Sequence, residues 1–349
     1  MEEHMARKLR LGRAAVKVIE NEKGKCISFG NHRCISPTKG AIQKKLDKGK
    51  RCKGKSKSCN EFVGRSPFVP EYDKKFLLPA IESEMLAFSL AEGDNILLIG
   101  PPGSGKTSLV KQLASILNWG VIQFSCSEET SSSKILGQWV VADKSMKWAD
   151  GYITTAMKYG YILLEDEADF MRPELRGEIH SVMEHKGTLT LSGIHPKTQE
   201  PFQEVVRKHP NFRWISTANT IGHGDDSFQY HGTQYMNAAA SDRYEIILQF
   251  EHKKSEDEIK ILTNKTNIEQ NIAEKMVEIA NICRKDENKE ILFQFTLRRL
   301  LSWGKYWQKV GEQASSISSV LNFCNETDRH FVKSLMRTHM GIDVDHKEE

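Results

Sequence analysis

The stretch Gly100-Pro101-Pro102-Gly103-Ser104-Gly105-Lys106-Thr107-Ser108 decides the fold of this chain. It follows the apolar run 95–99 and opens a segment with helical spacing of apolar residues that extends to Leu117. This order of strand, glycine-rich loop and helix is typical of a P-loop, whose backbone N–H groups surround the β-phosphate of a nucleotide. Lys106 would reach the phosphate oxygens, and the Thr107 hydroxyl would bind Mg²⁺. The stretch therefore predicts ATP and magnesium as cofactors, with a simple glycine turn as the alternative.

Composition sets the broad class of the protein. A chain of 349 residues with 39% hydrophobic content is long enough for a sizeable core and a smaller second domain. No apolar run approaches the length of a membrane span, and the N-terminus lacks the features of a signal peptide. We therefore expect a cytoplasmic protein with no membrane partner. Its seven cysteines predict reduced thiols or a metal site rather than a disulfide framework.

The first 60 residues carry most of the positive charge. They contain 17 Lys and Arg against 5 Asp and Glu, a net charge of +12, although the whole chain has a formal net charge of only +4. We expect residues 1–64 to form a basic, partly disordered arm, and attachment to nucleic acid or to an acidic partner is the alternative. Thiolates are suitable Zn²⁺ ligands, so the arm could hold zinc or only free thiols. Its four cysteines are Cys26, Cys34, Cys52 and Cys59.

Two further buried strands are expected after the P-loop. The first is 121–125, and the second is 161–167, which ends in acidic residues. Residues 126–150 look polar and irregular, and 152–159 form a helix. Asp166 is expected to bind Mg²⁺ through water, and Glu167 is expected to be the general base that polarises the attacking water. Glu165 departs from the apolar pattern of the strand, so its carboxylate is expected to face the site or solvent.

A set of motifs resembles the CobS-type ATPase subunit of aerobic cobaltochelatase, within the MoxR-like clade of AAA+ proteins. The resemblance extends over about residues 68–303 and leaves out the basic arm. The motifs that carry it are Tyr161 to Pro173, Phe212 to Thr220, Gly222 to Asp225, Tyr230 to Gln234, and Asp242-Arg243.

The resemblance implies roles for four further residues. Asn219 matches sensor 1, which orients the lytic water, although it could instead cap a turn. Arg243 matches the arginine finger that acts on a neighbouring subunit, with a structural salt bridge as the alternative. Arg298, with Arg299 as its rival, matches sensor 2, which contacts the phosphates; either could instead lie on a solvated helix face.

The whole sequence therefore predicts an α/β fold with two domains after the arm. Residues 65–252 would form an AAA+ nucleotide-binding domain with a parallel sheet, and 253–349 a small helical lid. An amphipathic helix within 68–90 would lead into the P-loop strand, and 187–209 would form a hairpin before sensor 1. By resemblance the chain assembles as a homo-oligomeric ring, a hexamer, and uses ATP to remodel a partner. That partner would be a chelatase subunit or a von Willebrand-type adaptor; the alternatives are a MoxR-like remodelling role without cobalt and a nucleic-acid-associated ATPase.

Overall fold

The computed structural model of this chain describes residues 67–143, 145–219, 238–285 and 291–344. It also describes a short antiparallel pair near the N-terminus, β1 (Phe29–Gly30) and β2 (Arg33–Cys34). The described residues fall into two compact units. The first contains residues 79–99 and 106–249 with the described part of 1–72, and the second contains 73–78, 100–105 and the described part of 250–349. The domain boundaries expected at residues 65 and 253 stay predictions.

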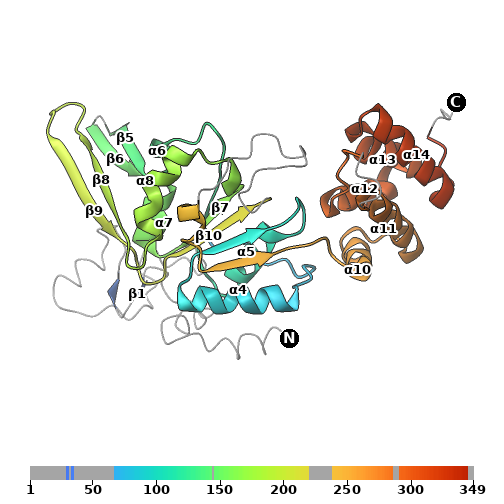
Figure 1. The fold of residues 1–349 in the computed structure, drawn as a ribbon, viewed down its shortest axis with the longest axis horizontal. Helices are drawn as coiled ribbons and strands as arrows, with labels where there is room; N and C mark the ends of the chain where they lie inside the picture. The colour runs from blue at the N-terminus through green and yellow to red at the C-terminus, as the bar shows by residue number, and fades with distance from the viewer. Residues whose placement is uncertain are drawn as a thin grey trace. The chain divides into compact units, whose positions relative to one another are not determined.

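A parallel β-sheet forms the centre of the first unit (Figure 1). Strands β3 and β10 are buried along their whole length, as expected for a sheet covered on both faces. The carboxyl ends of β3, β7 and β10 meet at one edge, because neighbouring strands are parallel and in register. The predicted α/β fold is confirmed. The strands lie in the order β11-β3-β10-β7-β4, with bounds β3 Ile96–Ile99, β4 Val121–Ser125, β7 Ile162–Asp166, β10 Arg213–Ala218 and β11 Ile246–Gln249.

Helices connect these strands in the first unit. The predicted helix 152–159 is present as α7 and ends at Gly160, which has φ of 71°. The helix expected within 68–90 begins only at Ala80, because Pro79 restricts the preceding residue to extended backbone. The described helices are α4 Ala80–Glu92, α5 Lys106–Ile116, α6 Ser132–Ile135, α7 Tyr152–Tyr159, the 3₁₀ turn η2 Ala168–Phe170, α8 Pro173–Met183 and α9 Ala238–Ser241.

Two β-hairpins are inserted between the elements of the first unit. The hairpin predicted for 187–209 is confirmed as β8 (Thr188–Ile194) and β9 (Pro201–Arg207). The irregular structure expected for 126–150 is wrong for its second half, which forms the hairpin β5 (Gly137–Ala142) and β6 (Ser145–Asp150). The turn between β5 and β6 gave no glycine signal, because Asp143 itself takes the left-handed backbone conformation with φ of 51°.

Aromatic side chains join the two hairpins, which lie side by side in Figure 1. Trp139 and Trp148 are cross-strand partners on β5 and β6, with their rings in edge contact. Phe202 on β9 contacts both of them, at ring-centroid distances of 5.4 Å to Trp139 and 5.1 Å to Trp148. Lys158 of α7 adds ion pairs at 2.9 Å to Asp150 and to Glu204, one on each hairpin. The hairpins therefore form a single packed body.

The second unit is helical after residue 250, as predicted for a lid. Its core contains Phe295 and Trp303, both almost fully buried. Trp303 also donates a hydrogen bond of 3.0 Å from Nε1 to Ser316 Oγ. The helices are α10 Ser255–Thr266, α11 Gln270–Arg284, α12 Leu297–Val310, α13 Glu312–Ser319, the 3₁₀ turn η4 Leu321–Phe323 and α14 Glu326–Met340. No helix among the described residues is long and apolar enough to cross a bilayer.

Candidate nucleotide-binding site

The glycine loop has a backbone that suits phosphate binding. Gly100, Gly103 and Gly105 have φ of 146°, 74° and 101°, values that side chains disfavour. At Gly100 a Cβ would lie only 2.1 Å from the carbonyl oxygen of Phe250, so only glycine fits there. The loop continues directly into α5, which begins at Lys106. Turns of this kind point successive N–H groups in one direction and so form a concave anion site.

Lys106 is buried and lies among acidic side chains. It is 7% exposed, and its Nζ donates a hydrogen bond of 3.4 Å to Oδ1 of Asn219. Burial lowers the pKa of Lys106 to about 8, while the carboxylates of Asp169, Asp166 and Glu167 act in the opposite direction. A phosphate beside this amine would add negative charge and favour its protonated form. Lys106 and Asn219, predicted separately from segments more than a hundred residues apart, thus meet at one site.

Asp166 lies at the end of β7 with both carboxylate oxygens hydrogen-bonded. Oδ1 accepts from the Thr107 hydroxyl at 2.9 Å and from the Thr217 hydroxyl, and Oδ2 accepts from Nε2 of Gln123 at 2.9 Å. Oxygen ligands of this kind, a hydroxyl and a carboxylate, are those that Mg²⁺ prefers. The donor set of Thr107 and Asp166 therefore fits the predicted metal. Neither Gln123 nor Thr217 was predicted as a site residue, although Thr217 lies within the motif Phe212 to Thr220. Both lie on strands that neighbour β7 in the sheet, Gln123 on β4 and Thr217 on β10.

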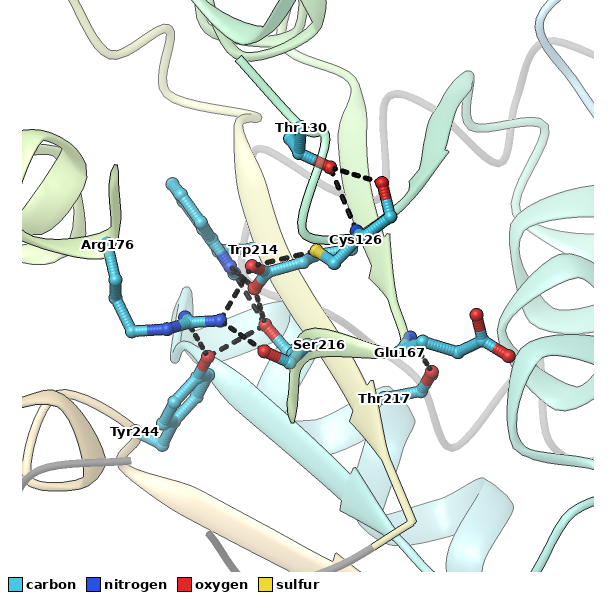
Figure 2. Close-up of polar contacts among 11 residues, drawn as sticks. Cys126, Thr130, Glu167, Arg176, Trp214, Ser216, Thr217 and Tyr244 are labelled. Atoms are coloured by element: carbon cyan, nitrogen blue, oxygen red, sulfur yellow. Dashed lines mark hydrogen bonds and ion pairs between the residues drawn. The ribbon is translucent and has the colours of Figure 1, made fainter. Parts of the chain in front are cut away.

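Glu167 occupies an unusual backbone conformation at the end of β7. Its φ is 57°, in the left-handed region, and its backbone N–H donates to the Thr217 hydroxyl at 3.2 Å. Figure 2 shows its carboxylate pointing away from the buried residues behind the turn, and the side chain is exposed. Asn219 is held at the end of β10, because its N–H donates to Oδ2 of buried Asp169 at 3.0 Å. Thr217 therefore restrains the backbone of Glu167, and Asp169, in the turn after β7, restrains the backbone of Asn219.

A second group of polar residues lies behind this turn, and it corrects one expectation. Glu165 faces neither the site nor solvent: its side chain is fully buried and pairs with Arg176 of α8 at 3.0 Å. Its other oxygen accepts from Ser216 and from Nε1 of Trp214. Burial and the charge of Glu165 raise the pKa of the neighbouring Cys126 thiol. The presence of a charged residue, Glu165, in an apolar strand indicated that it has a buried partner or a role. The sequence did not identify that partner, Arg176, which lies eleven residues away on another element.

Arg243 forms an ion pair within its own chain. Its Nη2 lies 2.9 Å from Oε1 of Glu184, which follows α8, and its Nη1 contacts the carbonyl of Ala239. The side chain of Arg243 is 26% exposed and that of Glu184 is 57% exposed. The geometry within one chain is thus that of a structural salt bridge, and the role toward a neighbouring subunit stays a prediction.

Arg298 and Arg299 lie at the start of α12 in the second unit. The guanidinium of Arg299 lies over the ring of Phe323 at 4.0 Å, whereas Arg298 is exposed. The P-loop turn, in the same unit, lies close to this helix start: a Cβ on Gly103 would be 3.1 Å from Cβ of Thr296 and 3.7 Å from the Arg298 nitrogen. The backbone at Arg298 therefore lies close to the P-loop turn, and the assignment of Arg298 or Arg299 as sensor 2 stays a prediction.

Several predicted residues cannot be placed in this site. Cys26, Cys52 and Cys59 lie outside the described residues, and Cys34 is described only as part of β2. The expectation of zinc in the arm thus stays a prediction. The motifs Gly222 to Asp225 and Tyr230 to Gln234 also lie outside the described residues, in the segment 220–237. Within the described ranges, no cluster of three His, Cys, Asp or Glu side chains could hold a metal ion.

Comparison with known proteins gives two family matches. Residues 95–232 match the AAA domain of the dynein-related subfamily, and residues 258–339 match the CbbQ/NirQ/NorQ C-terminal domain.

The chain is 27% identical over 288 residues to the aerobic cobaltochelatase subunit CobS of Sinorhizobium sp, covering 79% of this chain and 84% of that protein. It is 26% identical over 238 residues to an uncharacterised protein of Staphylococcus aureus (strain NCTC 8325 / PS 47), covering 66% and 77%. The RuvB Holliday junction branch migration motor of Thermotoga maritima aligns with a TM-score of 0.42 and 15% identity, covering 80% and 76%. The resemblance expected from the motifs is confirmed.

Proposed function

We propose that this chain, which belongs to the MoxR-like AAA+ ATPases, binds ATP with Mg²⁺ and hydrolyses it to drive rearrangement of a partner. The observation that carries the proposal is the hydrogen bond of 2.9 Å between Thr107 and Asp166. It joins the end of the P-loop to the acidic end of β7, the two halves of a P-loop hydrolase site.

Each residue around this hydrogen bond has a different role in the proposed hydrolysis. Lys106 neutralises negative charge on the transferred phosphoryl group, and Glu167 accepts a proton from the attacking water on its carboxylate. Asn219, whose side-chain oxygen is within 3.4 Å of Lys106 Nζ, orients that water. Bound Mg²⁺, held by Thr107 and through water by Asp166, would neutralise further charge on the phosphate oxygens. The fixed hydrogen bonds of Asp166 limit its reorganisation during the reaction.

We further propose that the active chain is a ring in which Arg243 acts on the site of a neighbouring copy. A guanidinium suits that task, because it is always charged and its donors match phosphate oxygens. Such a transfer requires Arg243 to leave Glu184. Ion pairs that are open to solvent contribute only about 0–1 kcal/mol, and the side chain of Glu184 is 57% exposed, so the exchange costs little. The lid would contribute Arg298 to the phosphates of its own subunit.

The match to CobS favours a role as the motor of a cobaltochelatase, with a chelatase subunit and an adaptor as partners. The second candidate is remodelling of a protein complex unrelated to cobalt, and the match of residues 258–339 is to the CbbQ/NirQ/NorQ C-terminal domain, whose description does not mention cobaltochelatase. In either role the joined hairpins β5–β6 and β8–β9 are the expected partner contact. Co-purification from the native host separates the two: capture of chelatase and adaptor subunits supports the first role, and capture of another complex without them supports the second.

A nucleic-acid-associated role rests on the charge of +12 in residues 1–60. It predicts nucleic-acid binding that weakens steeply with salt and disappears when residues 1–60 are deleted. Binding that is insensitive to salt, or absent in the full chain, would exclude this role.

The ATPase is tested by conservative substitution of the base. Glu167→Gln should retain nucleotide binding and lower turnover about 10²–10⁴-fold, the usual contribution of a general base. Glu174→Gln makes the same chemical change at an exposed residue of α8 and should leave turnover unchanged. Wild-type turnover in Glu167→Gln would show that the base is misassigned.

Lys106→Ala should weaken nucleotide binding, and Arg243→Ala subunits mixed into wild-type rings should lower their activity.

A further inference from the structure

Arg176 contacts the turn that carries Glu167 from two sides. This arginine of α8 is 4% exposed, and its Nη2 lies 3.0 Å from Oε1 of Glu165, two residues before Glu167. The same Nη2 donates to the carbonyl oxygen of Ala168, one residue after Glu167, at 2.7 Å. A single guanidinium nitrogen thus bridges the chain on either side of the expected general base.

Further buried hydrogen bonds surround the Glu165–Arg176 ion pair. The second oxygen of Glu165 accepts from Ser216 and Trp214, and Tyr244 donates to Ser216 Oγ at 2.8 Å. Burying two charges costs free energy that a well-packed apolar pair would not, so stability alone does not explain why an ion pair occupies this position. What the ion pair provides and an apolar pair cannot is a donor for the Ala168 carbonyl.

Glu167 needs such a restraint because its own backbone is strained. A non-glycine residue in the left-handed region costs of order 1–3 kcal/mol and persists only where its surroundings fix it. The Thr217 hydroxyl holds the N–H of Glu167, and Arg176 holds the next carbonyl along the chain. Both sides of the residue are therefore restrained by hydrogen bonds from other elements.

We propose that Arg176 is a positioning residue that fixes the Glu167 carboxylate for catalysis by holding the Ala168 carbonyl; this rests on the proposed ATPase function. Its effect is on the chemical step, because its hydrogen bonds go to Glu165, Ala168 and Tyr244, which are not residues assigned to nucleotide or metal binding. Loss of the donor should lower kcat about tenfold to a hundredfold, as small displacements of a catalytic group do. KM for ATP should stay within about twofold, since binding groups are unchanged.

The decisive variant is the double substitution Glu165→Leu with Arg176→Met. It replaces the buried pair by apolar side chains of similar size and should keep the melting temperature near that of the wild type. Ser216, Trp214 and Tyr244 would still bond to one another, at 3.0 Å and 2.8 Å. If Arg176 is a positioning residue, the kcat of this stable variant should be about tenfold to a hundredfold below that of the wild type. A wild-type kcat together with a wild-type melting temperature would mean that the pair is merely structural, and would overturn the inference.

Two controls isolate the contact with the turn. Tyr244→Phe removes a hydroxyl from the same buried group, which Arg176 Nη1 contacts at 3.4 Å, but leaves the Ala168 contact in place. It should lower the melting temperature without changing kcat, and a loss of kcat equal to that of the double variant would overturn the inference. In a Glu167→Gln background, Glu165→Leu with Arg176→Met should give no further loss. A full additional loss there would also overturn it. Wild-type turnover in Glu167→Gln alone would instead reject Glu167 as the base, whereas absence of ATP turnover in the wild-type protein would reject the ATPase assignment.

Discussion

Replacing Phe202 by alanine should loosen both hairpins at once. Phe202 belongs to β9, yet its ring contacts Trp139 and Trp148 of the other hairpin at 5.4 Å and 5.1 Å. An aromatic pair contributes about 0.5–1.5 kcal/mol beyond area burial, so the two contacts together amount to about 1–3 kcal/mol. That free energy corresponds to a change of about 5-fold to 150-fold in an opening equilibrium.

Native-state hydrogen exchange followed by mass spectrometry measures this opening for each strand separately. In Phe202→Ala, amides of β5–β6 and of β8–β9 should exchange faster by that factor, while the central sheet is unchanged. Val205→Ala is the matched control, since Val205 lies on the same strand but is 55% exposed. Faster exchange in β8–β9 alone would refute the reasoning, because it would show that the hairpins open independently.

Three further outcomes are expected. Gly160→Ala should lower the denaturant midpoint by the cost of a left-handed alanine, about 1–2 kcal/mol, or more, because its Cβ would lie 2.1 Å from His209 Nδ1; Gly177→Ala, where a Cβ meets nothing within 4 Å, should be neutral or stabilising. Thr296→Ala should cost the second unit about 1 kcal/mol, measured by urea unfolding, because the side chain caps α12, and Thr296→Ser should retain most of that stability. Burial and the nearby Cys324 raise the pKa of Cys283 to about 12, so at pH 8 its thiolate fraction is about a thousandfold below that of an ordinary cysteine. Alkylation mapped by mass spectrometry should therefore reach Cys283 only after unfolding, and rapid labelling of the native protein would contradict the assigned burial.

The P-loop and the strand 162–166 could be predicted because their signals are local. Each is an apolar run followed directly by the residues that carry chemistry, and parallel strands bring such ends to one edge of a sheet. The supporting contacts could not be predicted in this way. Gln123 and Thr217 hold Asp166 only because β4 and β10 neighbour β7, an order that sequence spacing does not reveal. The partner of Glu165 lies beyond a turn and on another element, so no helical or strand period connects the two residues.

The β5–β6 hairpin was missed for a related reason. Its turn uses Asp143 where a glycine or Asn-Gly signal would be expected, and its tryptophans pack against Phe202 of the other hairpin, a residue far away in the sequence. Arg243 shows a different limit. The Asp242-Arg243 motif indicated a role at a neighbouring site, but only the structure shows that Arg243 pairs with Glu184 within its own chain.

The joined hairpins also bear on how the chain folds while it is being synthesised. β5 and β6 can pair as soon as they leave the ribosome, because their turn is local. Trp139 and Trp148 can contact Phe202 only later, because Phe202 follows Trp148 by about fifty residues. At usual translation rates of about 5–20 residues per second, it is synthesised several seconds after Trp148. During that interval the two tryptophans contact each other but lack the contact with Phe202. We expect nascent chains that end before β9 to be held by chaperones, and chains extended beyond Arg207 to be released.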